Sequence, residues 1–176
     1  MYLQGNTNLF RNKILPGMVA LATMFISQTL CAQKSADNYE MSFVANKAHG
    51  DLLEKGRYGM AIQLLSGKTG NPLATSINLC VAEVMAGKFR DARRDCTRAV
   101  KLGERAANTA MESNRDELYK NWVVALSNRG VLRAIRNQSG AEEDFRHAIE
   151  LRIYADTASR NMARFNSKVG REVVSR

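Results

Sequence analysis

The chain has 176 residues, a formal net charge of +9, and hydrophobic residues at 45% of its positions. That apolar content is sufficient for a folded core and excludes wholesale disorder. Only 2 prolines and 3 cysteines are present, which favours helices over many turn-linked strands and excludes a disulfide-dense scaffold. The positive charge favours an anionic or apolar partner over a cationic one.

Residues 1–32 have the order of a secretory signal peptide. Arg11 and Lys13 precede an apolar run at residues 14–26, and a short stretch of polar and small residues follows it. A charged region, an apolar region and a cleavage region in this order are typical of exported proteins. The run is shorter than the roughly 20 residues of a membrane span. We expect cleavage after Ala32 and a periplasmic or secreted protein, with an uncleaved signal anchor as the alternative. An exported protein is not expected to bind nucleic acid, despite the positive charge.

After a polar linker at residues 33–40, the chain contains three copies of one sequence pattern. The middle copy is the clearest, with a helical stretch, a turn at Gly87 and a second helical stretch to about Met111. The first copy has its turn glycine at Gly56, and the third has Asn137 near the corresponding place. Each copy therefore predicts two helices joined by a tight turn. The helix after the middle copy is expected to start near residue 114 or 115.

This pattern resembles the tetratricopeptide repeat, a helix–turn–helix unit of about 34 residues. In that family, small residues stand where the paired helices approach closely, and aromatic residues follow the turn. The middle copy matches with Gly87, Phe89, Ala92 and Ala99, and the third matches with Ala141, Phe145 and Ala148.

The resemblance covers about residues 41–151 and implies an all-α fold, an α-solenoid of about three helix–turn–helix repeats. Apolar residues recur at helical spacing from residue 152 to Phe165, so we expect a C-terminal capping helix there. The repeat domain is accordingly assigned to residues 41–165 and a flexible tail to residues 166–176.

The sequence departs from the family pattern in several places. The signature tryptophan is missing from its position, and about sixteen extra residues separate the second and third copies. Gly50 and Gly130 each lie eleven residues before the next matching alanine, where the family has twelve. The register of the first helices of copies one and three against the family pattern is therefore undetermined by one residue. A non-repeating helical bundle is the alternative to the repeat fold.

Patterns typical of catalysis or metal binding are scarce. His49 and His147 have no Cys, Ser or Asp partner at a spacing that indicates a nucleophile and its base. No CxxC pair is present for a zinc site. The acidic cluster at residues 142–144 opens a helix, where negative side chains favour the helix dipole. We therefore expect a protein that is not an enzyme and that needs no cofactor and no metal.

The resemblance also implies that the first helix of each repeat lines a concave groove. Here that lining is mainly aliphatic and small, which suits an apolar or helical segment of a protein partner. The alternative is that these side chains pack the first helices against one another without a ligand. The predicted groove residues are Ile77, Val81, Val84, Val124, Ser127 and Val131.

The expected function is that of a non-enzymatic protein–protein interaction module in the cell envelope. One alternative is a structural or self-assembling module whose groove is filled by its own C-terminal helix or by a second copy. Another is an envelope adaptor that binds anionic surfaces through a basic run between Lys88 and Lys101. Asp91 and Asp95 interleave with that run, so a solvated face with local ion pairs is the favoured interpretation of it.

Cys80 and Cys96 are a candidate disulfide pair. The resemblance places them on the two helices of the second repeat, seven residues before Gly87 and nine residues after it. Antiparallel helices would bring both cysteines to a similar height along the helix pair. The periplasm or the cell exterior, to which the protein would be exported, permits a disulfide. Two buried thiols that act as small hydrophobes are the alternative.

Overall fold

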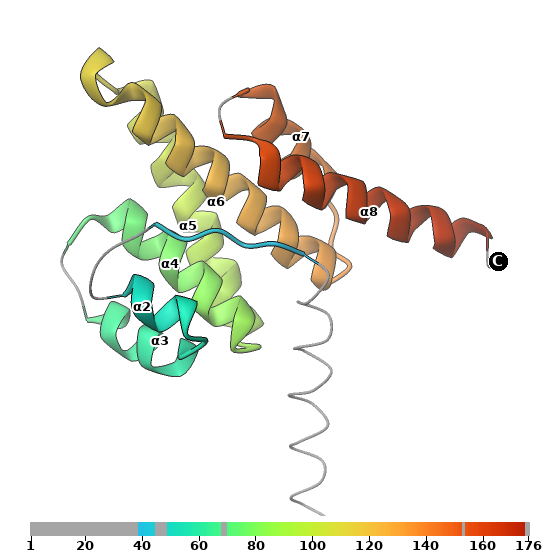
Figure 1. The fold of residues 1–176 in the computed structure, drawn as a ribbon, viewed down its shortest axis with the longest axis horizontal. Coiled ribbons are helices and arrows are strands. Elements are labelled where there is room, and N and C mark those ends of the chain that lie inside the picture. Colours follow the sequence, from blue (N-terminus) through green and yellow to red (C-terminus); the bar gives the residue numbers. More distant parts are fainter. Residues whose placement is uncertain (1–38, 45–48, 68–69, 153, 175–176) are drawn as a thin grey trace, which may run out of the picture.

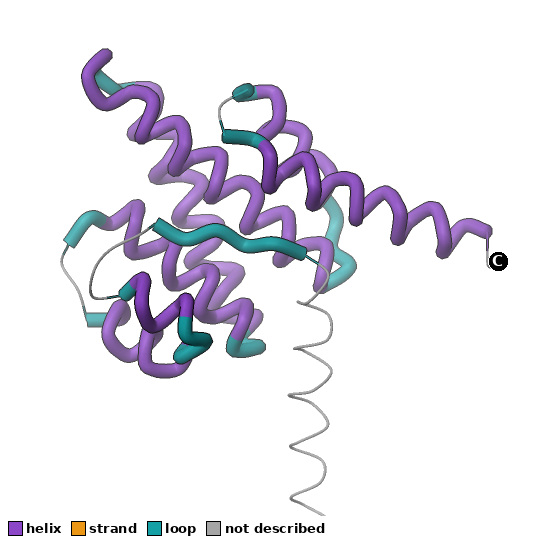
Figure 2. The backbone as a smooth tube through the Cα atoms, viewed as in Figure 1, coloured by secondary structure: helices purple, strands orange, loops and turns teal. Residues whose placement is uncertain are grey.

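The computed structural model describes residues 39–44, 49–67, 70–152 and 154–174, with side chains described as far as residue 170. The predicted signal peptide therefore lies outside the described residues. Throughout the described part the secondary structure is helical, with seven α-helices, one short 3₁₀ turn and no strand (Figure 1 and Figure 2). The all-α class is thus confirmed.

Each helix packs against the next one along the chain, and α6 also contacts α4 and α8. None of the helices in the described part is long and apolar enough to cross a membrane. The bounds are α2 Gly50–Glu54, α3 Tyr58–Ser66, α4 Pro72–Met85, α5 Phe89–Asn108, η1 Glu112–Asn114, α6 Arg115–Ile135, α7 Ala141–Glu150 and α8 Asp156–Val174.

The turns at Gly56, Gly87 and Asn137 have the same local structure. All three residues have a left-handed backbone, with φ of 67°, 72° and 50°. In each turn this residue's amide bonds the carbonyl three residues back, and the next amide bonds the carbonyl five residues before it. This pattern ends helices, and glycine and asparagine adopt its left-handed conformation most readily. The three predicted turns are confirmed.

The one-residue discrepancy of the third copy arises after its turn. Gly130 lies seven residues before Asn137, just as Cys80 lies seven residues before Gly87, so the two first helices share one register. The second helix begins two residues after Gly87 but four residues after Asn137. A second left-handed residue, Gly140 with φ of 85°, precedes it.

Two helix ends differ from the expectation. α5 ends at Asn108 instead of about Met111, and the Thr109 hydroxyl donates to the carbonyls of Arg105 and Ala106 at 3.0 and 3.4 Å. The Arg105 carbonyl also accepts the Thr109 amide at 3.2 Å, and the hydroxyl adds a bond to the Ala106 carbonyl near the end of the helix. α8 continues to Val174, so residues expected to form a flexible tail are helical.

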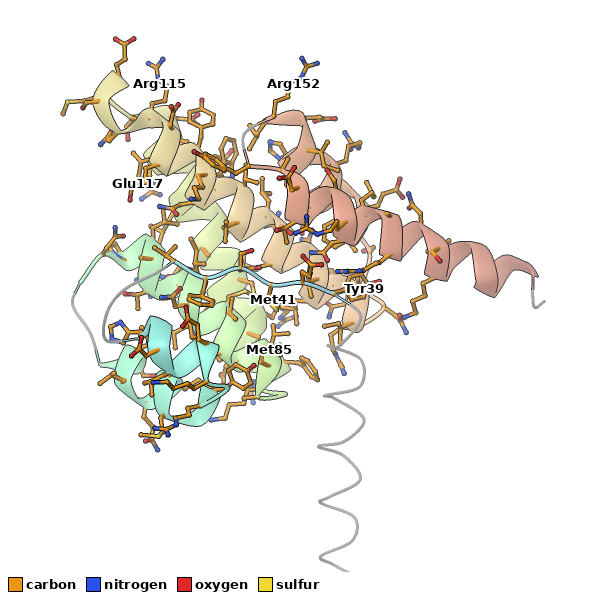
Figure 3. All side chains as sticks on the ribbon, viewed as in Figure 1. Tyr39, Met41, Met85, Arg115, Glu117 and Arg152 are labelled. Atoms are coloured by element: carbon orange, nitrogen blue, oxygen red, sulfur yellow. A yellow bond between two sulfur atoms is a disulfide. The ribbon has the colours of Figure 1, made fainter. Side chains whose placement is uncertain are left out.

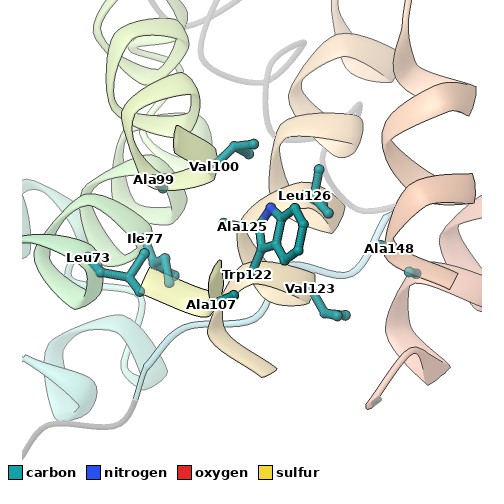
Figure 4. Close-up of a cluster of buried hydrophobic side chains, with 11 residues drawn as sticks. Leu73, Ile77, Ala99, Val100, Ala107, Trp122, Val123, Ala125, Leu126 and Ala148 are labelled. Atoms are coloured by element: carbon teal, nitrogen blue, oxygen red, sulfur yellow. The ribbon is translucent and has the colours of Figure 1, made fainter. Parts of the chain in front are cut away.

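The core lies between the helices as a series of buried clusters. The largest joins α4, α5 and α6 with parts of α7 and α8 around Trp122 and Leu126 (Figure 4). α5 and α6 approach closely at Gly103, where an added Cβ would lie 3.0 Å from the Trp122 Cα atom. Small residues thus set the helix spacing.

A disulfide joins Cys80 on α4 to Cys96 on α5, with Cα atoms 4.8 Å apart. Both cysteines are fully buried. Counted from the turn, Gly130 corresponds to Cys80, and the side chain that faces it is Phe145, whose ring would lie 2.6 Å from an added Cβ. One helix pair therefore fills this position with a disulfide, and the next fills it with an aromatic ring over a glycine.

Candidate functional site

Residues 39–44, called the N-segment below, cross the helices as an extended chain. Figure 1 shows this blue segment running over α4 and α6, and Figure 3 labels Tyr39 and Met41 along it. Three buried asparagines hold it, one on each of α4, α6 and α8. This asparagine row consists of Asn78, Asn128 and Asn161.

Each asparagine of the row bonds both backbone groups of one N-segment residue. The side-chain oxygen accepts from that residue's amide, and the side-chain nitrogen donates to its carbonyl. The pairs, with these two distances, are Asn78 with Val44 (2.9 and 3.0 Å), Asn128 with Ser42 (3.1 and 2.7 Å) and Asn161 with Glu40 (2.8 and 2.7 Å).

The spacing of these bonds follows from the extended backbone. Alternate residues of an extended chain face the same side, so the row meets residues 40, 42 and 44. The three asparagines are at most 2% exposed. A buried amide without partners costs about 1–3 kcal/mol, so the row requires a backbone, or comparable polar groups, lying over it.

The intervening residues of the N-segment pack apolar side chains against the helices. Tyr39 stacks on Phe145 with ring centroids 6.4 Å apart. Met41 packs against two clusters, one around the disulfide and one around Phe145, and Phe43 packs against the cluster of α3 and α4. Backbone bonds combined with alternate side-chain anchors are a recurring mode of peptide recognition.

Glu40 carries the only charge of the N-segment. Arg160 donates from Nε and Nη2 to Glu40 Oε2 at 2.9 and 2.7 Å, and Arg164 Nη2 donates to Oε1 at 2.6 Å. These hydrogen bonds lower the pKa of the Glu40 carboxyl. Both arginines lie on α8, four residues apart, so they share one face of that helix.

The predicted groove residues lie beneath this arrangement. Five of them are buried, at most 4% exposed, and Val124 is half-buried. The Ser127 hydroxyl accepts a hydrogen bond from Asn161 Nδ2 at 3.3 Å. A hollow of about 280 Å³ remains beside Val124 and Ser127, and Phe43 and Tyr154 also line it. The buried ones are Ile77, Val81, Val84, Ser127 and Val131, and of these Ser127 also lines that hollow.

The sequence-based prediction misses the asparagine row, although a signal for it exists. Asn78 lies nine residues before Gly87, and Asn128 lies nine residues before Asn137. Asn161 follows Asn128 by 33 residues, which is close to the length of the repeat that the sequence resembles. A polar residue that recurs at one position of an apolar helix is the pattern that indicates the row.

A second signal lies in the N-segment itself. Tyr39, Met41 and Phe43 alternate with other residues, which is the period of an extended chain. The predicted boundary between linker and repeat domain divides this pattern at residue 40. In the structure residues 39–44 form one extended segment that lies over the helices. A groove filled by the C-terminal helix is one of the arrangements expected from the sequence. α8 instead contributes Asn161 to the row.

The basic run between Lys88 and Lys101 lies on the exposed side of α5. Arg94 is paired, with its Nη2 atom 2.8 Å from Asp95 Oδ2. A shallow hollow of about 690 Å³ extends along this side of the helix. Within the described residues no ion pair forms at the other exposed cations of this side, which are Arg90, Arg93, Arg98, Lys101 and Arg105.

One buried acidic pair lies between α4 and α5. Glu83 and Asp95 are each 3% exposed, and Arg94 Nη2 lies 3.9 Å from Glu83 Oε1. Burial, and next the charge of Asp95, raise the pKa of Glu83 to about 8. Neither of the two hollows described above reaches this acidic pair. We therefore assign the pair a structural role at the contact between α4 and α5.

Metal-binding geometry is not found in the described part of the chain. No group of three His, Cys, Asp or Glu residues there could hold a metal ion. The His147 ring meets the Trp122 ring edge-on, with centroids 5.2 Å apart. His49 is buried, and its Nε2 atom has no hydrogen-bond partner among the residues that the structure describes.

No protein-family model matches the chain, and no curated protein or solved structure matches it either. What the site can do therefore follows from its geometry. It offers paired backbone hydrogen bonds, apolar contacts at alternate residues and two arginines at one end.

Proposed function

We propose that the protein is a non-enzymatic interaction module that binds an extended polypeptide segment across α4, α6 and α8. The observation that carries this proposal is the asparagine row. Three buried amides on three helices each bond both backbone groups of one residue. Every peptide has such backbone groups, so the row suits a segment of a protein partner.

The proposal includes a repeat fold of the tetratricopeptide type. The shared structure of the turns at Gly56, Gly87 and Asn137 supports it. In this reading α8 is the first helix of a fourth unit, because Asn161 bonds the N-segment as Asn128 does. Successive first helices would then present one asparagine each to a bound chain.

We place the module in the cell envelope. The signal-peptide pattern of residues 1–32 supports export. The Cys80–Cys96 disulfide also supports it, since disulfides persist mainly in oxidising compartments.

The N-segment is the resident occupant of the site, and an incoming segment replaces it. Its apolar side chains at residues 39, 41 and 43 are only half-buried, so the exchange exposes limited apolar surface. The N-segment of a second copy fits equally well, and reciprocal exchange would join two copies.

Competition in the complete protein tests this proposal. A protease site inserted within residues 45–48 allows the N-segment to be severed after folding, with both parts still present. A fluorescent peptide of residues 38–45 should then bind and raise the fluorescence anisotropy. Asn128→Ala removes two hydrogen bonds and should weaken binding by about tenfold.

Asn114→Ala is the matched control, because Asn114 is exposed and makes no side-chain capping bond. It should leave the affinity unchanged. A cut protein that never takes up the peptide would contradict the proposal, as would equal affinities for the Asn128 and Asn114 variants. A rise in mass to a dimer, measured by light scattering on the uncut protein, would identify a second copy as the partner.

The basic side of α5 favours a second candidate function, adhesion to an anionic envelope surface. Five exposed cations without ion pairs in the described part line one side of a single helix. Pelleting with vesicles that contain anionic lipid should therefore be strong at low salt and weak above about 0.5 M, where screening is short-ranged. Equal pelleting with neutral vesicles would exclude this candidate.

A further inference from the structure

We propose that the site selects peptides with an acidic residue between two apolar ones, and that Arg160 and Arg164 read this acidic side chain and thereby fix the register of the bound chain. This inference rests on the proposed function and names the class of peptide. It starts from what the asparagine row leaves undetermined.

The asparagine row cannot fix the register of a peptide. Its hydrogen bonds go to amides and carbonyls, which are the same at every residue other than proline. Because the row meets every second residue, a chain that slips by two residues presents the same backbone groups to the same asparagines. Side chains must therefore decide which residue lies where, as they do for strand register in sheets.

Glu40 is the side chain that distinguishes one register from the others. A slip of two residues would place Asn38 or Ser42 opposite Arg160 and Arg164. Neither of these residues has a carboxylate, so the three charge-assisted hydrogen bonds of Glu40 would be lost. The neighbours of Glu40, Tyr39 and Met41, are the apolar residues that pack against the helices.

The two arginines are held in place by residues of their own helix. Arg160 Nη2 donates to the Thr157 hydroxyl at 3.3 Å, and Arg164 Nη1 donates to Asn161 Oδ1 at 3.4 Å. Asn161 thus bonds the peptide backbone and also orients the cation that reads the side chain. This arrangement reduces the ordering needed when a carboxylate binds.

The arginine pair is also accessible to a partner. The side chains of Arg160, Arg164 and Glu40 are 53%, 40% and 39% exposed, so an incoming carboxylate can replace that of Glu40 from solvent. Among the described residues no acid other than Glu40 forms an ion pair with either arginine. Asp156 lies near Arg160 and influences it only at longer range.

The test uses the protein that is severed within residues 45–48, and two peptides of residues 38–45. One peptide keeps glutamate at residue 40, and the other carries Glu40→Gln. The glutamate peptide should bind about tenfold more tightly at low salt, because two half-exposed ion pairs are at stake. High salt should reduce this difference.

A double change isolates the interaction. Against the variant Arg160→Gln/Arg164→Gln, the two peptides should bind with equal affinity. Arg98→Gln, an exposed arginine on α5, is the matched control and should preserve the tenfold preference. Thermal unfolding of the severed variants verifies that each is folded.

A measurement of where the bound peptide lies distinguishes recognition of one register from unspecific electrostatic attraction. A photo-reactive group at the position of Met41 should crosslink the glutamate peptide at one place, near Val84 and Leu132. With the glutamine peptide the crosslinks should spread along α4, α6 and α8. A glutamine peptide that binds and crosslinks like the glutamate peptide would overturn this inference while the proposed function stands. If neither peptide binds, the proposed function and this inference both fail.

Discussion

At Gly130 the lack of a side chain allows α6 and α7 to pack closely. An added Cβ would lie 2.6 Å from a ring carbon of Phe145, and that ring is fully buried. Gly130→Ala should therefore lower the free energy of unfolding by about 1–3 kcal/mol through overpacking. Urea unfolding followed by circular dichroism measures this change.

Gly59→Ala provides the control for Gly130→Ala. Gly59 lies in α3 and is exposed, and an added Cβ meets no atom within 4 Å. Alanine should be neutral there or add up to about 1 kcal/mol through helix propensity. If both alanines destabilise the protein equally, close packing at Gly130 is not the cause.

Glu83 should make stability depend on pH. Burial, then the charge of Asp95, raise its pKa to about 8 from a usual value of 4.5. The fold therefore favours the protonated acid, and this contribution is complete below about pH 4.5 and is lost as the pH rises towards 8. For one group the slope is at most about 1.4 kcal/mol per pH unit.

Glu83→Gln should flatten this decline, since the amide does not ionise. The measurement compares urea unfolding of both proteins at pH 5, 6.5 and 8. The difference in unfolding free energy should shift in favour of the variant as the pH rises. Parallel curves for the two proteins would show that Glu83 is ionised in the fold throughout this range.

At the scale of elements, the N-segment should exchange its amide hydrogens in an alternating pattern. The amides of residues 40, 42 and 44 donate to buried asparagines. Among the described contacts, those of Met41 and Phe43 make no such bond. Hydrogen exchange followed by NMR should therefore show slow, fast and slow sites in turn, and Asn128→Ala should release Ser42 most. Uniform exchange would contradict the bonding pattern.

The disulfide between α4 and α5 is a separate prediction about the isolated protein. Its two cysteines are 16 residues apart and fully buried. Thiol titration of the unfolded mature protein should find neither cysteine free until a reductant is added. Reduction should lower the unfolding free energy by about 3 kcal/mol in the chain-entropy model. Two free thiols before reduction would show that the pair is unbonded in the cell.

The helix pairs could be predicted from the sequence because their determinants are local. Gly87 ends α4 with a left-handed turn, and Ala92 and Ala99 allow α5 to approach. The asparagine row could not be predicted in the same way. Its bonds to the N-segment join residues that are 34, 86 and 121 positions apart, so only the packed array brings them together.

The groove prediction shows a second limit of sequence patterns. An aliphatic side chain that lines an open channel and one that lies between two helices produce the same apolar periodicity. Ile77 and Val131 are fully buried in core clusters. The site also depends on polar residues, the asparagine row and two arginines, which the helical pattern alone leaves unassigned.

For the molecule as a whole, the N-segment provides contacts that a simple row of helices lacks. In a repeat array each unit contacts only its neighbours, so the ends can unfold separately. Here Glu40 bonds α8, Val44 bonds α4, and Phe43 packs with α3. Six residues thus link elements from both ends of the described chain.

Met41→Asp should therefore weaken the cooperativity of unfolding. Met41 packs against the cluster around the disulfide and the cluster around Phe145. Because a carboxylate at this place would be poorly solvated, the N-segment should detach. In the unchanged protein, urea transitions seen by Trp122 fluorescence and by circular dichroism should coincide. In the variant the two transitions should separate, because α3 and α4 lose their link through the N-segment to α6 and α8. Met60→Asp is the control, since Met60 is 54% exposed on α3; it should keep the transitions coincident. Coincident transitions in Met41→Asp would show that helix-to-helix packing alone makes the array cooperative.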